Sequence, residues 1–178
     1  LRMPRGLGTW AAFAWLGVFG NAIPFSLFAW GQTHISGGQA SILNATQPLF
    51  TVLVAHALTL DEKMTRGHLL GAVIGLVGVA TMIGSDAVSL LGHNALAQLA
   101  CLAGTLSYAF AAVYGRRFAK IGIRPLAVAT GQLVAVSAIM LPVALIVDQP
   151  WELPLPTATT IIAVVCQALF STALAYVL

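Results

Sequence analysis

The eight Lys and Arg residues of this chain all fall in alternate gaps between its long apolar runs. They gather in three short segments, 1–9, 61–66 and 116–124, whereas the intervening gaps hold only acids or no charge. Lys and Arg stay on the cytoplasmic side when a helix bundle threads a bilayer back and forth. A soluble helical protein has no reason to alternate its cations in this way. The pattern therefore predicts a membrane protein whose three basic segments face the cytoplasm.

The composition excludes a soluble domain. The chain is 59% hydrophobic and 7% charged, whereas a soluble domain carries roughly 25% charged residues. The net charge of +3 comes from thin clusters beside the apolar runs and does not form the basic face that nucleic acid needs. Cys101 and Cys166 lie inside apolar runs, which favours neither a disulfide framework nor a metal site. We expect no nucleic-acid partner, no metal and no cofactor.

Six apolar runs are long enough to cross about 30 Å of hydrocarbon as helices. They are residues 10–33, 38–60, 67–84, 95–116, 125–147 and 157–178. The sequence thus predicts an all-α, polytopic transmembrane helix bundle. Because the chain starts at Leu1 and stops at Leu178 within apolar sequence, we expect it to be truncated at both ends.

An internal repeat relates the first run to the last. Residues 18–27 resemble residues 169–178 at a fixed offset of 151 positions. The two copies lie five spans apart, and an odd number of spans forces them to run in opposite directions. Inverted repeats are typical of secondary transporters, which bind their substrate between the halves near the midplane.

A longer stretch resembles a known family. Residues 38–51 read Gly-Gln-Ala-Ser-Ile-Leu-Asn-Ala-Thr-Gln-Pro-Leu-Phe-Thr, similar to the fourth helix of EamA-type transporters of the drug/metabolite transporter superfamily. The turn at 62–65, the glycines at 71, 75 and 78, and residues 107–117 also resemble family elements. The resemblance implies ten helices in two inverted five-helix repeats. This chain would hold the last three helices of the first repeat in 1–84 and the first three of the second in 95–178.

Polar side chains near the middle of the spans are candidate substrate ligands, because an amide in hydrocarbon is costly without a partner. Residues at steps of three and four share a helix face. This spacing predicts one face on each of the first two spans: Asn21, Phe25, Phe28 and Gln32 on the first, and Ser41, Asn44, Gln47/Pro48 and Thr51 on the second. The alternative is interhelical hydrogen bonding that only holds the bundle together, at about 0.6 kcal/mol per contact. The candidate substrate-binding residues are Asn21, Phe25, Phe28, Asn44, Gln47, Pro48, Tyr108 and Gln167.

A proline, a row of glycines and two ionisable residues lead to further predictions. Pro48 should kink the second helix and free the carbonyl of Asn44, which gives an acceptor cluster for ammonium or hydroxyl groups. The third run carries a ridge of small residues, at which helices approach closely: Gly67, Gly71, Gly75 and Gly78. His56 and Glu62 are candidates for a coupling or gating role, the alternatives being a packing histidine and a turn that pairs charges at the interface.

These features favour a transporter over two other classes of protein. The predicted function is alternating-access transport of a small polar metabolite, such as an amino acid or a relative, across the inner (plasma) membrane. The alternative is a non-transporting membrane scaffold subunit, and a homodimer is left open. An intramembrane enzyme is disfavoured, because the chain has no Gly-x-Ser-x-Gly, no His-Glu-x-x-His and no paired intramembrane carboxylates. The expected partners are the lipid bilayer and the small-molecule substrate.

Overall fold

The computed structural model describes residues 6–59, 66–83, 94–152 and 155–174. These residues form helices and no strand, so the predicted all-α fold is confirmed. Two short π-helices interrupt the α-helices. In chain order the elements are α1 (Leu7–Gly17), η1 (Val18–Ala22), α2 (Ile23–Gly31), α3 (Gly37–Asn44), α4 (Gln47–Leu58), α5 (Arg66–Ile83), α7 (Ala95–Lys120), α8 (Pro125–Val147), α9 (Ala158–Cys166) and η2 (Gln167–Leu174).

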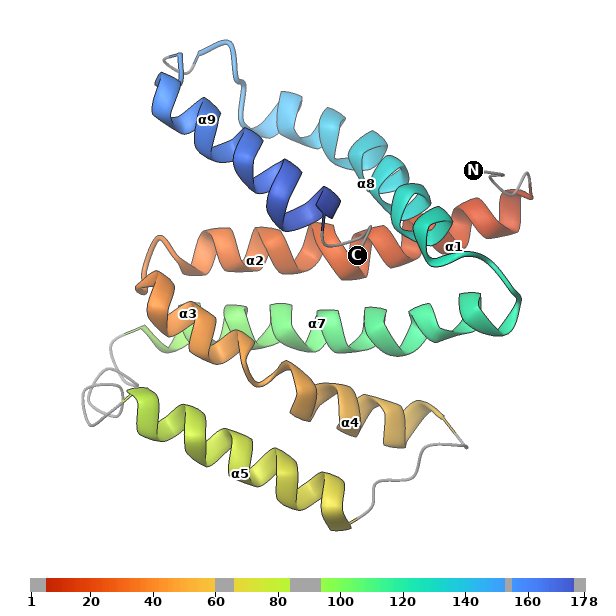
Figure 1. Cartoon of the computed structure of the whole chain (residues 1–178). Helices are drawn as coiled ribbons and strands as arrows, with labels where there is room; N and C mark the ends of the chain where they lie inside the picture. Colours follow the sequence, from red (N-terminus) through yellow and green to blue (C-terminus); the bar gives the residue numbers. More distant parts are fainter. Residues whose placement is uncertain (1–5, 60–65, 84–93, 153–154, 175–178) are drawn as a thin grey trace.

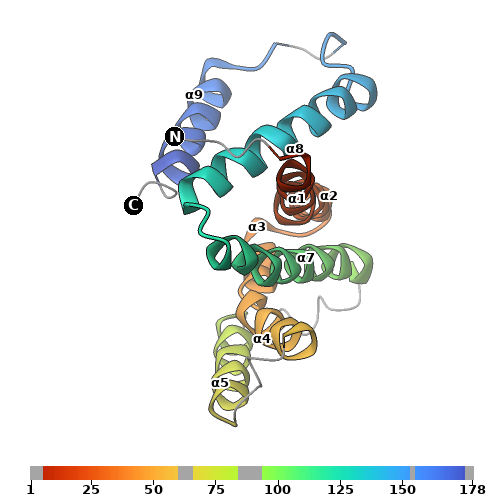
Figure 2. The same cartoon turned by 90° about the vertical axis from the view of Figure 1, so that its right-hand side faces the viewer.

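The helices are stacked around α7. In both views α7 lies between the α1–α2 segment and α4, and α3 crosses α7; α8 and α9 lie beyond α1–α2, and α5 lies beyond α4 (Figures 1 and 2). The buried face of α7 is built mainly from small side chains, among them Ala97, Cys101, Gly104 and Ala109. Lipid tails provide no hydrophobic drive for helix association, so such residues stabilise the bundle by letting backbones pack closely.

Four helical segments of the described residues are long and apolar enough to cross a membrane: Leu7–Gly31, Gly37–Leu58, Ala95–Lys120 and Pro125–Val147. They match the first, second, fourth and fifth predicted runs within a few residues. The third run is the 18-residue helix α5, which is not one of the four. The described part of the sixth is the shorter apolar helix Ala158–Phe170. The chain is a polytopic helical bundle.

The interruption expected at Pro48 is found as a break between two helices, not as a kink within one. The α3 helix ends at Asn44, and α4 begins at Gln47 with Pro48 in its first turn. Proline suits a first turn, since the N–H that it lacks has no partner within a helix there. Pro24 takes the same place in α2, directly after the π-helical turn η1.

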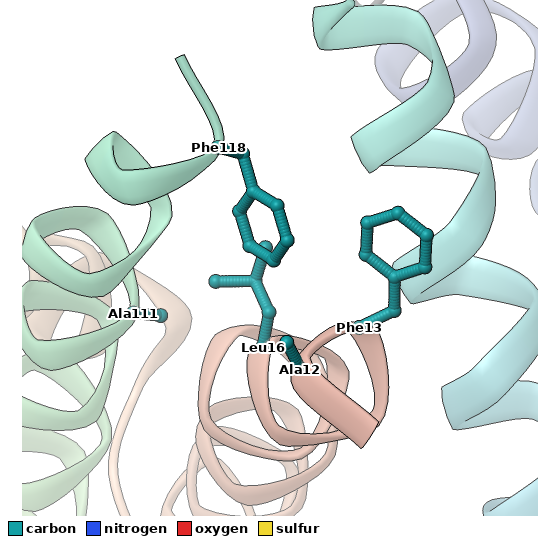
Figure 3. Packing of buried hydrophobic residues seen from close by; sticks show 5 residues of the cluster. All are labelled: Ala12, Phe13, Leu16, Ala111 and Phe118. Atoms are coloured by element: carbon teal, nitrogen blue, oxygen red, sulfur yellow. The ribbon is translucent and has the colours of Figure 1, made fainter. Parts of the chain in front are cut away.

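An apolar cluster joins α1 to α7 and α8 (Figure 3). Its buried residues are Ala12, Phe13, Leu16, Ala111 and Phe118. The Phe13 ring is stacked on Phe118 with centroids 5.2 Å apart. A Cβ at Gly131 would come within 2.5 Å of the Phe13 ring. One at Gly17 would come within 2.7 Å of the Gln132 carbonyl oxygen. Glycines on both helices therefore permit the α1–α8 contact.

The glycine ridge of α5 behaves differently. Among the described residues, no heavy atom outside the local helix lies within 4 Å of a Cβ built at Gly71, Gly75 or Gly78. The predicted close approach at these glycines is therefore not found in this part of the chain. Among the described residues, glycines that allow close packing lie on α1, η1, α2, α7 and α8.

We expect Gly17→Ala to lower the free energy of unfolding by about 1–3 kcal/mol, because the backbone carbonyl of Gln132 cannot move aside like a flexible side chain. The matched control Gly75→Ala should be neutral or stabilise by up to about 1 kcal/mol, since alanine is the better helix former. Thermal unfolding in detergent micelles, followed by circular dichroism, measures both. An unchanged midpoint for Gly17→Ala would contradict the α1–α8 packing.

Candidate functional site

A cavity of about 430 Å³ lies between α2, α3, α7 and η2. It contains five of the eight predicted substrate-binding residues, contributed by four different elements. None of its lining side chains is charged. The lining consists of Phe25, Phe28, Ala29, Gln32, Ala40, Ser41, Asn44, Tyr108 and Gln167.

Helical spacing explains why these side chains meet. Positions 25, 28 and 29 of α2, together with the residue Gln32 that caps its C-terminus, recur at steps of three and four and so share one face. On α3, positions 40, 41 and 44 do the same. A capping box fixes the start of α3, because the Ser36 hydroxyl accepts from the Gln39 amide and the Gln39 side chain accepts from the Ser36 amide. Gln32 and Ser41 belong to the site through the same spacing that identifies Phe28 and Asn44.

One wall of the cavity is aromatic. The ring of Tyr108 lies edge-on to Phe25, with centroids 6.2 Å apart, and tilted 6.3 Å from Phe28. A Cβ at Gly104 would lie 3.2 Å from the Phe28 ring, so this glycine lets the ring approach α7. Aromatic rings bind apolar groups by burial and bind cations through the negative charge of their faces.

The part of the lining that comes from α3 carries a buried hydrogen-bond acceptor. The side-chain oxygen Oδ1 of Asn44 is buried and has no hydrogen-bond partner among the described residues. Its neighbours are satisfied locally: the Ser41 hydroxyl donates to the Gly37 carbonyl over 2.9 Å, and the Thr105 hydroxyl donates to the Cys101 carbonyl over 2.9 Å. A buried acceptor without a partner costs about 1–3 kcal/mol. An acceptor left open at a cavity wall is suited to bind a donor from a ligand.

Residues 2–84 match the EamA-like transporter family. This part of the chain, slightly less than half of its length, is similar to that family. The chain is thus a multi-pass membrane protein that carries an EamA-like segment, of which the α2 and α3 walls of the cavity are part.

Individual EamA-like relatives match over partial lengths. The chain is 28% identical over 141 residues to the uncharacterized transporter YyaM of Bacillus subtilis, covering 78% of this chain and 44% of that protein. It is 27% identical over 90 residues to the uncharacterized transporter YoaV of the same species, covering 51% of this chain and 30% of that protein. The matched segments thus span less than half of either relative.

A third relative has a more specific description. The chain is 39% identical over 56 residues to the probable terminal-alkyne amino-acid exporter of Streptantibioticus cattleyicolor, covering 32% of this chain and 18% of that protein. No solved structure matches this chain.

Three predicted substrate-binding residues lie outside the cavity lining. Asn21 is buried in η1, where its side-chain nitrogen Nδ2 has no hydrogen-bond partner among the described residues. Gln47 begins α4, and its carbonyl accepts from the Thr51 hydroxyl over 2.9 Å. Pro48 is exposed beside it. The break between α3 and α4 separates Gln47 from the face that carries Asn44.

The two residues predicted for coupling or gating are not part of the cavity. His56 lies exposed in the last turn of α4 and does not line the cavity. Glu62 lies outside the described residues. Within the described ranges, no group of three His, Cys, Asp or Glu side chains is placed to hold a metal ion.

We expect Asn44→Leu to leave the free energy of unfolding unchanged or to raise it by at most about 3 kcal/mol, because the variant removes a buried acceptor that has no partner among the described residues. The control Thr105→Val removes a satisfied buried hydroxyl and should destabilise by about 0.6 kcal/mol. Thermal unfolding in matched micelles compares the two variants. A clear loss of stability in Asn44→Leu would mean that Oδ1 is paired in the folded protein.

Proposed function

We propose that the chain forms the substrate-binding core of a transporter for a small polar metabolite that carries an ammonium or hydroxyl group. The observation that carries this proposal is the buried, unpartnered Oδ1 of Asn44 at the wall of the cavity. The group that donates to Oδ1 lies against the aromatic wall of Phe25, Phe28 and Tyr108. An ammonium gains there both a charge-assisted hydrogen bond and cation–π contacts.

The chemistry of the lining narrows the substrate class. A lining without charged groups favours a substrate of low net charge, since no fixed ion offsets the desolvation of a net charge. Side-chain amides and hydroxyls at positions 32, 41 and 167 supply both donors and acceptors for the rest of such a molecule. An amino acid or a close relative fits these requirements. The Streptantibioticus relative, described as a probable amino-acid exporter, is in keeping with this class.

The two π-helical turns support the proposed inverted repeat. At the offset of 151 positions, residues 18–22 correspond to residues 169–173, and these lie inside η2. Both repeat copies thus contain the same uncommon helical turn, a form found mostly at functional sites. In transporters built from inverted repeats, irregular helices lie at the substrate site, and one repeat rocks against the other. We propose this mechanism here, with residues 1–84 and 95–178 as the parts of the two repeats.

The orientation in the membrane is part of the proposal. The basic segments 1–9, 61–66 and 116–124 would face the cytoplasm by the charge rule. The first helical span, Leu7–Gly31, would then run outward, and α8 would run outward from its start at Pro125. The cavity would lie partway across the bilayer, and the substrate would cross the inner (plasma) membrane through it.

A transport assay on the full-length protein in membrane vesicles tests the function. Radiolabelled amino acids and related amines are screened, and flux is compared among wild type, Asn44→Leu and Gln47→Leu. We expect Asn44→Leu to lose transport of one compound class at least tenfold, because about 1.4 kcal/mol of lost binding is a factor of ten. Gln47→Leu, three residues away and outside the cavity lining, should retain it.

The other outcomes are equally informative. Unchanged transport by Asn44→Leu at equal expression would place the substrate site elsewhere. Equal losses in the two variants would show that the effect is not specific to the cavity lining. No flux of any solute with wild-type protein would favour the scaffold alternative.

A further inference from the structure

A second cavity, of about 640 Å³, lies where the basic end of α7 meets α1 and the end of α4. It is larger than the candidate substrate cavity and shares no residue with it. In Figure 1 this region is at the right-hand end of α7 and α4. Its lining combines cations, aromatic rings and apolar side chains: Trp15, Leu58, Thr59, Phe110, Val113, Tyr114, Arg116, Arg117 and Lys120.

The aromatic side chains build a fixed base for one of the cations. The Trp15 ring packs on Tyr114 with centroids 3.9 Å apart. The guanidinium of Arg117 lies 4.5 Å from the centre of the Tyr114 ring and donates to the Tyr114 hydroxyl. These contacts hold the guanidinium at the cavity wall, so binding an anion costs little further side-chain entropy.

The charge of this region favours an anion. The carboxylates that the structure describes, Asp148 and Glu152, follow the far end of α8. The lining contains three cations and no carboxylate. Asp61 and Glu62 follow Thr59 in the sequence and lie outside the described residues. A phosphate group has oxygens that accept paired hydrogen bonds from arginine.

The other lining residues indicate which kind of molecule the phosphate group belongs to. Leu58, Phe110 and Val113 continue the cavity along apolar surface, which a small inorganic anion would leave unused. Tryptophan and tyrosine at a membrane–water interface mark headgroup depth. Basic pockets between transmembrane helices bind anionic lipid headgroups. We propose that this cavity is a binding site for an anionic phospholipid, with its phosphate at Arg116, Arg117 and Lys120 and an acyl chain along the apolar wall.

Tryptophan quenching in bilayers tests the site. In a variant that keeps Trp15 alone (Trp10→Phe, Trp30→Phe and Trp151→Phe), brominated phosphatidylglycerol and brominated phosphatidylcholine are compared at equal mole fractions. We expect brominated phosphatidylglycerol to quench Trp15 at least about five times as strongly as brominated phosphatidylcholine, because one cation near the surface contributes about 1 kcal/mol to binding an anionic lipid. Arg117→Gln should lower that preference about fivefold. The matched control Arg124→Gln, which removes a nearby cation outside the cavity, should keep it.

Each other outcome overturns the proposal. Equal quenching by the two lipids would show that no anionic lipid is selected. Equal losses in Arg117→Gln and Arg124→Gln, with helicity intact by circular dichroism, would assign the preference to diffuse surface charge. Loss of the preference on adding inorganic phosphate at constant ionic strength would assign the site to a free anion.

Discussion

Close packing against α7 is the constraint on which the rest of this bundle depends. Hydrocarbon solvates a leucine as well as another helix does, so transmembrane helices associate where small residues let their backbones approach. The buried face of α7 meets this need with alanine, glycine, serine and cysteine. That face allows α2, α3 and α4 to pack along one helix. Both cavities take part of their lining from α7.

The two cavities differ in the chemistry of their lining residues. The candidate substrate cavity has aromatic rings and uncharged polar groups, whereas the cavity at the basic end has three cations on an aromatic base. Tyr108 belongs to the first and Tyr114 to the second, and these residues lie six positions apart on α7. A single helix thus provides an aromatic side chain to each site, and the small residues between them maintain the packing.

Much of this arrangement could be predicted from the sequence, because hydrophobic length and helical spacing are local properties. The all-α bundle, four of the six spans and the shared face of Phe25 and Phe28 follow from the printed residues alone. The grouping of Asn44 with Tyr108 and Gln167 rests on the prediction that polar groups at similar depth face a common interior. Their placement around one cavity agrees with that expectation, and their role as substrate ligands stays a prediction.

The failures arise where tertiary packing or a local break decides the outcome. Asn44 and Gln47 would share a face on a continuous helix, but the turn at Ala45 and Thr46 ends α3 and starts a new helix. The glycines of α5 have the spacing of a packing ridge, yet close contacts with other helices are made by glycines elsewhere, among them Gly17, Gly31 and Gly131. Spacing identifies a face of a helix but not the neighbour that the face meets.

The π-helical turn η1 gives the first membrane span an unusual independence of its two halves. A π-helical turn contains an extra residue, so the side chains that follow it are rotated relative to a continuous α-helix. The helix before the turn, α1, packs on α8. The helix after it, α2, packs on α7 and lines the candidate substrate cavity. Changes in the pocket-lining half can therefore accumulate without disturbing the anchoring half. The residues of α2 that line the cavity can therefore change while the contact between α1 and α8 is kept.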